Sequence, residues 1–110
     1  MIENRIERIQ STIESSGAIP DEAKAELLGL VSGLKSEIEA LSETHHEEAS
    51  SIMRFADASA HEAGRSQKNP QLAETALQGL RASIQGFEDS HPTLVAAVNR
   101  FATALSNMGL

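Results

Sequence analysis

The feature that most constrains the fold is an apolar stripe of helical period that recurs along most of the chain. In four segments, apolar residues step by four and three, the spacing that places side chains on one face of an α-helix. The stripes are Ile2, Ile6, Ile9 and Ile13; Leu27, Val31, Leu34, Ile38 and Leu41; Ala73, Leu77, Leu80, Ile84 and Phe87; and Leu94, Val98, Phe101, Leu105 and Met108. No stretch alternates with the period of a strand. The sequence therefore predicts an all-α protein, and 110 residues suffice for a single domain, residues 1–110.

The second stripe is interrupted after Leu41. The next two stripe positions hold the polar residues His45 and Glu48, and the pattern then resumes, offset by one step of four, at Ala49, Met53, Ala56, Ala60 and Ala63. Such an offset is a stutter, which relaxes a supercoil without ending a helix. In that position His45 and Glu48 could be polar residues that fix the register of a packed seam, and protonation of the histidine would then make the interface sensitive to pH.

Two interpretations of residues 20–63 follow. We favour one unbroken helix, which would be about 66 Å long at 1.5 Å per residue. The alternative is a break near Ser42 and a new helix from Thr44, whose hydroxyl could form a capping box with Glu47. The Ala-rich second half of this segment would let a neighbouring helix approach closely.

The remaining boundaries are marked by Gly, Pro and Asn. The first helix is expected over residues 2–16, the third over residues 70–87 after the start signal Asn69-Pro70, and the fourth from Pro92 to a closing Gly109. Gly64 is the expected cap of the long helix. The predicted architecture is a bundle or antiparallel coiled coil of four amphipathic helices, with one long helix as its spine and the last two as a hairpin.

Composition excludes several classes of partner. Nine Lys and Arg against 16 Asp and Glu give a net charge of −7, which disfavours nucleic acid and anionic membranes. Three Phe and no Trp or Tyr leave few platforms for base stacking. The absence of Cys excludes disulfides and thiolate chemistry and fits a reducing compartment. The N-terminus lacks the apolar core of a signal peptide, and no apolar run is long enough to span a membrane, so we expect a cytoplasmic protein.

The leading functional prediction is a non-enzymatic scaffold or protein-interaction module. A helix of about 15 residues is marginal alone in water, and a stripe of β-branched Ile requires a partner. We therefore expect a homo-oligomer, a dimer in the simplest case, that buries the Ile stripe and the Ala-rich half in coiled-coil-like seams. An unidentified protein could use the same stripes. The sequence predicts no catalytic residues and no cofactor.

The alternative function is a metal-binding bundle. Glu43 and His46 have the Glu-x-x-His spacing of di-iron bundles, because positions i and i+3 share a helix face, and Glu47 could add a ligand. The rest of the chain supplies no second such motif. A symmetric dimer would be needed to double the site.

Two features of the last quarter could carry a site. In Ser90-His91-Pro92, adjacent residues at a helix start rarely orient as nucleophile and base, so we expect His91 to cap or pack a tight turn. Asn99 and Arg100 flank Phe101 and could mark a recognition surface, although polar residues beside a seam are more often simply solvated.

The sequence of residues 86–110, GFEDSHPTLVAAVNRFATALSNMGL, resembles the ending of a family of short bacterial helical proteins, domain of unknown function 4404. The matching positions are Phe87, Glu88, Ser90, His91, Pro92, Leu94, Met108, Gly109 and Leu110. The resemblance implies a small bacterial helical protein with a glutamate-rich opening helix pair, and it implies no activity. Over the first two helices it is only compositional, and residues 44–69 look longer than the family usually carries.

Overall fold

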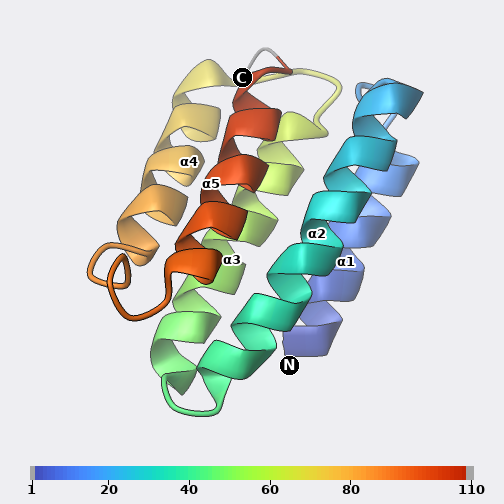
Figure 1. Cartoon of the computed structure of the whole chain (residues 1–110). Coiled ribbons are helices and arrows are strands. Elements are labelled where there is room, and N and C mark those ends of the chain that lie inside the picture. The colour runs from blue at the N-terminus through green and yellow to red at the C-terminus, as the bar shows by residue number, and fades with distance from the viewer. Residues whose placement is uncertain (1, 109–110) are drawn as a thin grey trace.

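Within residues 2–108, the chain folds into five α-helices joined by short connections (Figure 1). This computed structural model describes residues 2–108, with side chains from residue 4 onward. The helices are α1 (Ile2–Ser15), α2 (Asp21–Ser42), α3 (His46–Ala63), α4 (Pro70–Ser83) and α5 (Pro92–Ser106). All regular secondary structure among the described residues is helical, which confirms the all-α prediction. None of these helices is both long and apolar enough to cross a membrane.

The predicted long helix over residues 20–63 is wrong, and with it the count of four helices. After the last turn of α2, the backbone N–H groups of Thr44 and His45 donate to the Leu41 carbonyl at 3.1 and 2.8 Å. His45 then leaves the helical region at φ −132° and ψ 63°, and α3 begins at His46. The alternative interpretation placed the break correctly near Ser42, where α2 ends. Its capping box between Thr44 and Glu47 does not form, since His45 is the N-cap and makes no side-chain cap bond. Polar residues at two stripe positions leave little apolar contact to hold a straight helix here, whereas folding back buries α3 against the rest of the chain.

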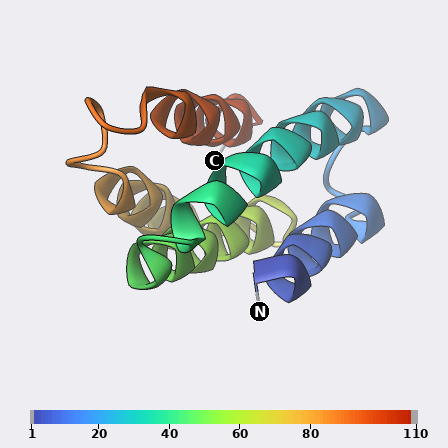
Figure 2. The same cartoon turned by 60° about the horizontal axis from the view of Figure 1, so that its bottom comes forward.

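The five helices form two layers. Figure 2 shows α1, α3 and α4 side by side in one layer and α2 and α5 in the other. Neighbouring helices in sequence are antiparallel, and α2 packs against α1, α3 and α5. The result measures 37 × 24 × 21 Å, which is much shorter than the helix of about 66 Å that the continuous interpretation requires.

The Ile stripe of α1 is buried inside the chain itself. Ile6, Ile9 and Ile13 are 2%, 0% and 0% exposed, against α2 and α3. The side chain of Ile2, the first residue of the predicted stripe, lies outside the described residues. The prediction that this stripe needs a partner is therefore met by the same chain and not by a second copy.

Helix α3 occupies the centre of the fold and contacts all four other helices. Most of its buried residues are small, which lets its neighbours approach closely, as expected for the Ala-rich segment. They are Ala49, Ile52, Met53, Ala56, Ser59, Ala60 and Ala63. The hydroxyl of Ser59 has no hydrogen-bond partner.

The start of α4 and the end of α3 confirm their sequence signals. The side chain of Asn69 accepts a hydrogen bond from the backbone N–H of Leu72 at 3.2 Å, and Pro70 occupies the first turn. Gly64 is the C-cap of α3, and its N–H donates to the Ala60 carbonyl at 3.0 Å.

Helix α4 ends four residues earlier than the predicted residue 87. Gly86 has φ +94°, a conformation that favours glycine. The Glu88 carboxylate accepts the Gly86 N–H at 3.0 Å and holds the turn. The expected closing residue Gly109 lies outside the described residues.

Candidate functional site

The seam between α2 and α5 opens into two adjoining clefts near the start of α2 and the end of α5. Their volumes are about 490 and 400 Å³, and they share Glu26, Ala104 and Asn107. We call them together the α2–α5 groove. It is lined by Ala18, Pro20, Glu22, Ala23, Glu26, Leu27, Leu30, Asn99, Arg100, Thr103, Ala104, Asn107 and Met108. Each cleft is within the size range of pockets that accept ligands or anchor side chains.

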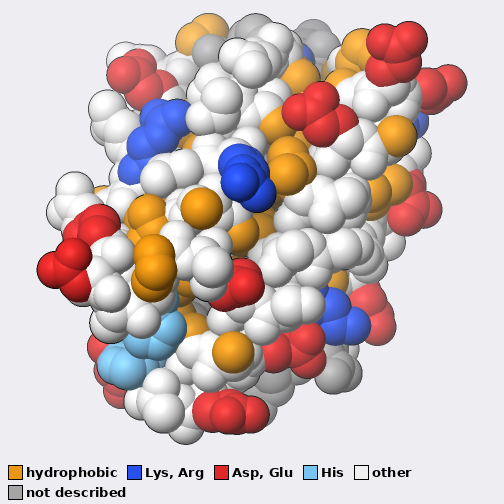
Figure 3. Space-filling model, viewed as in Figure 1, with side chains coloured by type: hydrophobic (Ala, Val, Ile, Leu, Met, Phe, Trp, Pro, Cys, Tyr) orange, Lys and Arg blue, Asp and Glu red, His pale blue; other side chains and the backbone are white. Residues whose placement is uncertain are grey.

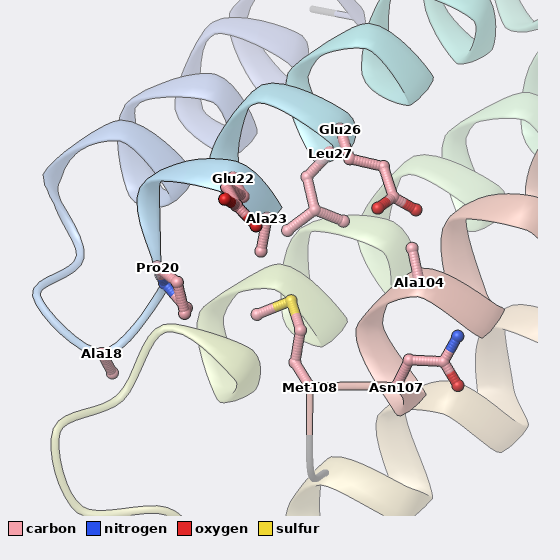
Figure 4. Close-up of a pocket in the computed structure, with 9 residues that line it drawn as sticks. All are labelled: Ala18, Pro20, Glu22, Ala23, Glu26, Leu27, Ala104, Asn107 and Met108. Carbon is pink, nitrogen blue, oxygen red and sulfur yellow. The ribbon is translucent and has the colours of Figure 1, made fainter.

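The floor of the groove is apolar. Leu27 and Ala104 are buried at its base, while Ala23, Leu30 and Met108 are half-buried along it. Figure 4 shows the Met108 side chain extending from the end of α5 toward Ala23 and Leu27 on α2. A flexible thioether beside small side chains can rearrange around an inserted apolar group.

The rim of the groove is charged and polar. Glu22 and Glu26 lie one turn apart on α2, and Asn99, Arg100 and Asn107 come from α5 and its end. In Figure 4 the Glu26 carboxylate points across the opening toward α5. The same face in Figure 3 shows hydrophobic side chains between acidic groups over α2 and a basic group over α5. An apolar floor with a charged rim is the usual plan of a recognition surface.

The other half of the same seam is closed. Leu34 and Ile38 of α2 and Leu94 and Val98 of α5 are buried at 0–1% exposure. The Thr93 hydroxyl donates to the Glu37 carboxylate at 2.8 Å across the two helices. The opening is therefore a local feature of the seam and not a general looseness between α2 and α5.

The structure does not assemble Glu43, His46 and Glu47 as the predicted metal site requires. The shared face of positions i and i+3 needs one helix, but Glu43 is the C-cap of α2 and His46 is the first residue of α3. All three side chains are exposed. Within residues 2–108, no three His, Asp or Glu side chains lie close enough together to hold a metal ion.

His45 and Glu48 do not lie in a buried seam. Glu48 is exposed, and the half-buried His45 ring packs with two rings of the α4–α5 connection. The rings of His45, Phe87 and His91 contact one another edge to face, with centroids 5.4–5.7 Å apart. This trio joins the α2–α3 turn to the α4–α5 turn and gives a structural role to Phe87 and His91.

Each histidine of the trio also contacts the hydroxyl that precedes it. Thr44 Oγ1 lies 2.8 Å from His45 Nδ1, and Ser90 Oγ lies 2.9 Å from His91 Nδ1. His91 is the N-cap of α5 but makes no side-chain cap bond, so the packing half of its prediction holds and the capping half does not. Among the described residues neither imidazole forms an ion pair with a carboxylate, and a nucleophile–base–acid arrangement is therefore not assembled.

Sequence reasoning found part of the groove and missed the rest. Asn99 and Arg100, noted as a possible recognition surface, both line it. Met108 was predicted only as the last residue of an apolar stripe, and no sequence pattern marked Glu22 as a groove residue. The groove forms only because the start of α2 and the end of α5 lie side by side in the fold, and no local sequence pattern predicts that contact.

One of three comparisons with known proteins returns a match, and it covers almost the whole chain. The model of one protein family, Domain of unknown function (DUF4404), matches residues 2–110, a wider span than the resemblance over residues 86–110 indicated. The match includes residues 44–69, which looked unusually long for the family. A search of curated proteins and a search of solved structures each return no match. The chain belongs to the DUF4404 family.

Proposed function

We propose that this protein is a non-enzymatic helical module that binds another protein through the α2–α5 groove. The observation that carries the proposal is the contrast within the α2–α5 seam. The half formed by the end of α2 and the start of α5 is closed by buried side chains, whereas the half formed by the start of α2 and the end of α5 presents an apolar floor inside a charged rim. Grooves between helices commonly accept an amphipathic helix whose side chains are spaced by three and four residues. The groove's lining suits recognition through apolar contact and hydrogen bonds.

Self-association remains a prediction, but the surfaces first expected to form the dimer interface are buried within the chain. The Ile stripe and the Ala-rich helix, the two surfaces invoked for a coiled-coil dimer, are occupied within the chain. A second copy would therefore have to pack on a surface other than these two. Absolute mass from light scattering after size exclusion, with detection by refractive index, distinguishes a monomer from a dimer in a chain that has no Trp or Tyr.

The proposal includes the cytoplasm of a bacterium as the site of action. Its support is the resemblance to a bacterial family and the absence of Cys from the sequence, which suits a reducing compartment. Fractionation of cells that express the protein at its natural level tests this part.

Site-specific crosslinking tests the binding function. Photoreactive residues are placed at Asn99 and Asn107 on the groove, and at Glu7 and Glu14 on α1 as exposed controls in the other layer. In cells of the organism that encodes the protein, we expect adducts of one defined mass from the groove positions only. The captured protein, once purified, should shift the backbone amide signals of residues 22–30 and 99–108.

Three results would count against this function. They are equal adducts from all four positions, no adduct from the groove positions, and a purified partner whose signals map elsewhere. Adducts between two copies of the chain would identify a second copy as the occupant and contradict a separate partner protein.

A further inference from the structure

The rim of the groove carries two acidic residues on its α2 side and one basic residue on its α5 side. Glu22 and Glu26 lie one helical turn apart on α2, so both carboxylates border the same opening. Among the described residues, neither forms an ion pair, and neither does Arg100 on the facing wall. Elsewhere among the described residues, two acids, Asp57 and Glu62, form ion pairs. Asp57 lies 3.6 and 3.3 Å from Arg5 and Arg8.

A role in stabilising helix α2 explains only one of the two acidic residues on the rim. Glu22 is in the first turn of α2, where the helix dipole favours an acid. Glu26 is one turn further along, and its carboxylate points across the opening above Leu27 and Ala104 (Figure 4). An apolar hollow thus lies directly beside two carboxylates that have no cation of their own among the described residues.

From this arrangement we infer the chemistry of the occupant, an inference that rests on the proposed function. The occupant is an amphipathic helix of another protein that inserts aliphatic side chains over Leu27 and Met108. It sets a pair of Lys or Arg residues, one turn apart, against Glu22 and Glu26. Its cations are confined to that end, because Arg100 faces the next part of the groove and would repel a helix that is basic along its whole length.

Net charge argues against a second copy as this occupant. Each chain carries −7, so two copies repel each other, whereas a segment with local positive charge is attracted and steered toward the acidic rim. Specificity at such a rim comes from complementary charges, while the apolar floor supplies most of the contact area.

Three synthetic peptides of about 18 residues, long enough to form a helix on binding, probe the inference. They share one leucine face and differ only in a pair of residues one turn apart at one end: Lys, Glu or Gln. Each is titrated into the isotope-labelled full-length protein while the backbone amide signals are followed. We expect the Lys peptide to bind at residues 22–30 and 99–108, about tenfold more tightly than the Glu peptide, with the Gln peptide between them.

Matched variants locate the effect. The double variant Glu22→Lys with Glu26→Lys should reverse the order of the peptides. The double variant Glu7→Lys with Glu14→Lys makes the same change in net charge on α1, away from the groove, and should preserve the order. Because lysines at the start of α2 could loosen that helix, Glu26→Gln alone provides a milder version that should lower the preference for the Lys peptide.

The outcomes separate this inference from the function on which it rests. Equal binding of the Lys and Gln peptides in the groove would overturn the inferred charge pair and leave the groove as a binding site. An equal loss of preference in the α1 control would show that net charge alone acts, which also overturns it. No groove shifts with any peptide would overturn the inferred helix, whereas crosslinking at Asn99 and Asn107 decides the proposed function independently.

Discussion

The surroundings of α3 and the seam between α2 and α5 show two outcomes of helix packing in one small protein. Around α3, mostly small buried residues let four other helices pack against one helix. Between α2 and α5, larger apolar residues fill the seam at the end of α2 and the start of α5. At the start of α2 and the end of α5, the seam stays open as a groove of two clefts with volumes of about 490 and 400 Å³. A chain of 110 residues thus closes its core around one helix and leaves an opening at another.

The difference between the two regions lies in side-chain size and charge. In the central region, Ala56 and Ala60 on α3 are both 0% exposed. At the groove, Ala23 and Ala104 are equally small, but the helices there carry Glu26 and Arg100, whose charged ends favour water over a tighter seam. Small residues therefore close a seam only where their neighbours can be buried with them.

The largest expected effect comes from the same substitution made in each region. Ala56→Leu adds volume at a fully buried position of α3 and should lower the free energy of unfolding by about 2–3 kcal/mol, because close-packed interiors do not absorb extra carbon atoms. Ala23→Leu on the groove floor should change it by no more than about 0.5 kcal/mol. Urea unfolding followed by circular dichroism measures both. Equal losses would mean that the groove is as closely packed as the centre.

The next effect concerns the contact between α3 and α4. The Phe55 ring lies over Gly79, where an added Cβ would overlap the ring. Gly79→Ala should therefore give no net gain in the natural chain, but should stabilise the Phe55→Ala variant by about 1 kcal/mol through helix propensity. Gly33, which has open space around it, is the control. Gly33→Ala should stabilise the natural chain and the Phe55→Ala variant equally. If Gly79→Ala also stabilised both equally, the contact between the Phe55 ring and Gly79 would have no effect on stability.

An effect of similar size concerns the one buried hydroxyl without a partner among the described side chains of the centre. Ser59 is 0% exposed and its Oγ has no hydrogen-bond partner. Ser59→Ala should raise the free energy of unfolding by about 1 kcal/mol more than Ser36→Ala, an exposed change with the same gain in helix propensity. Thermal unfolding of the two variants gives the difference. A loss of stability at Ser59 would show that the hydroxyl is satisfied in solution.

The sequence predicted the helices better than their arrangement. Local signals act over a few residues, so Asn69-Pro70 and Gly64 marked helix ends correctly. The break at residues 43–45 was weighed as an alternative near Ser42 but not favoured, because both sides of it carry apolar stripes in helical phase, and a stutter and a turn leave the same pattern. Which stripe packs on which depends on contacts between residues far apart in sequence.

The candidate site was predictable only in fragments for the same reason. Asn99 and Arg100 stood out as polar residues beside a seam, but Glu22 and Met108, 86 positions apart in the sequence, line one cleft only in the folded chain. The Glu43-His46 motif failed in the opposite way. Its spacing was correct for a helix, and the helix ends between its two members.

The most direct test of the whole account is a distance between α2 and α3 within one chain. The protein has no Cys, so Ala25→Cys with His61→Cys, two exposed positions, gives two unique sites for spin labels. Dilution with unlabelled protein restricts the measured pairs to a single chain even if copies associate. The folded-back arrangement predicts a distance below the 37 Å long axis of the molecule. A distance of about 54 Å, the length of an unbroken helix between the two positions, would contradict the fold and the groove built on it.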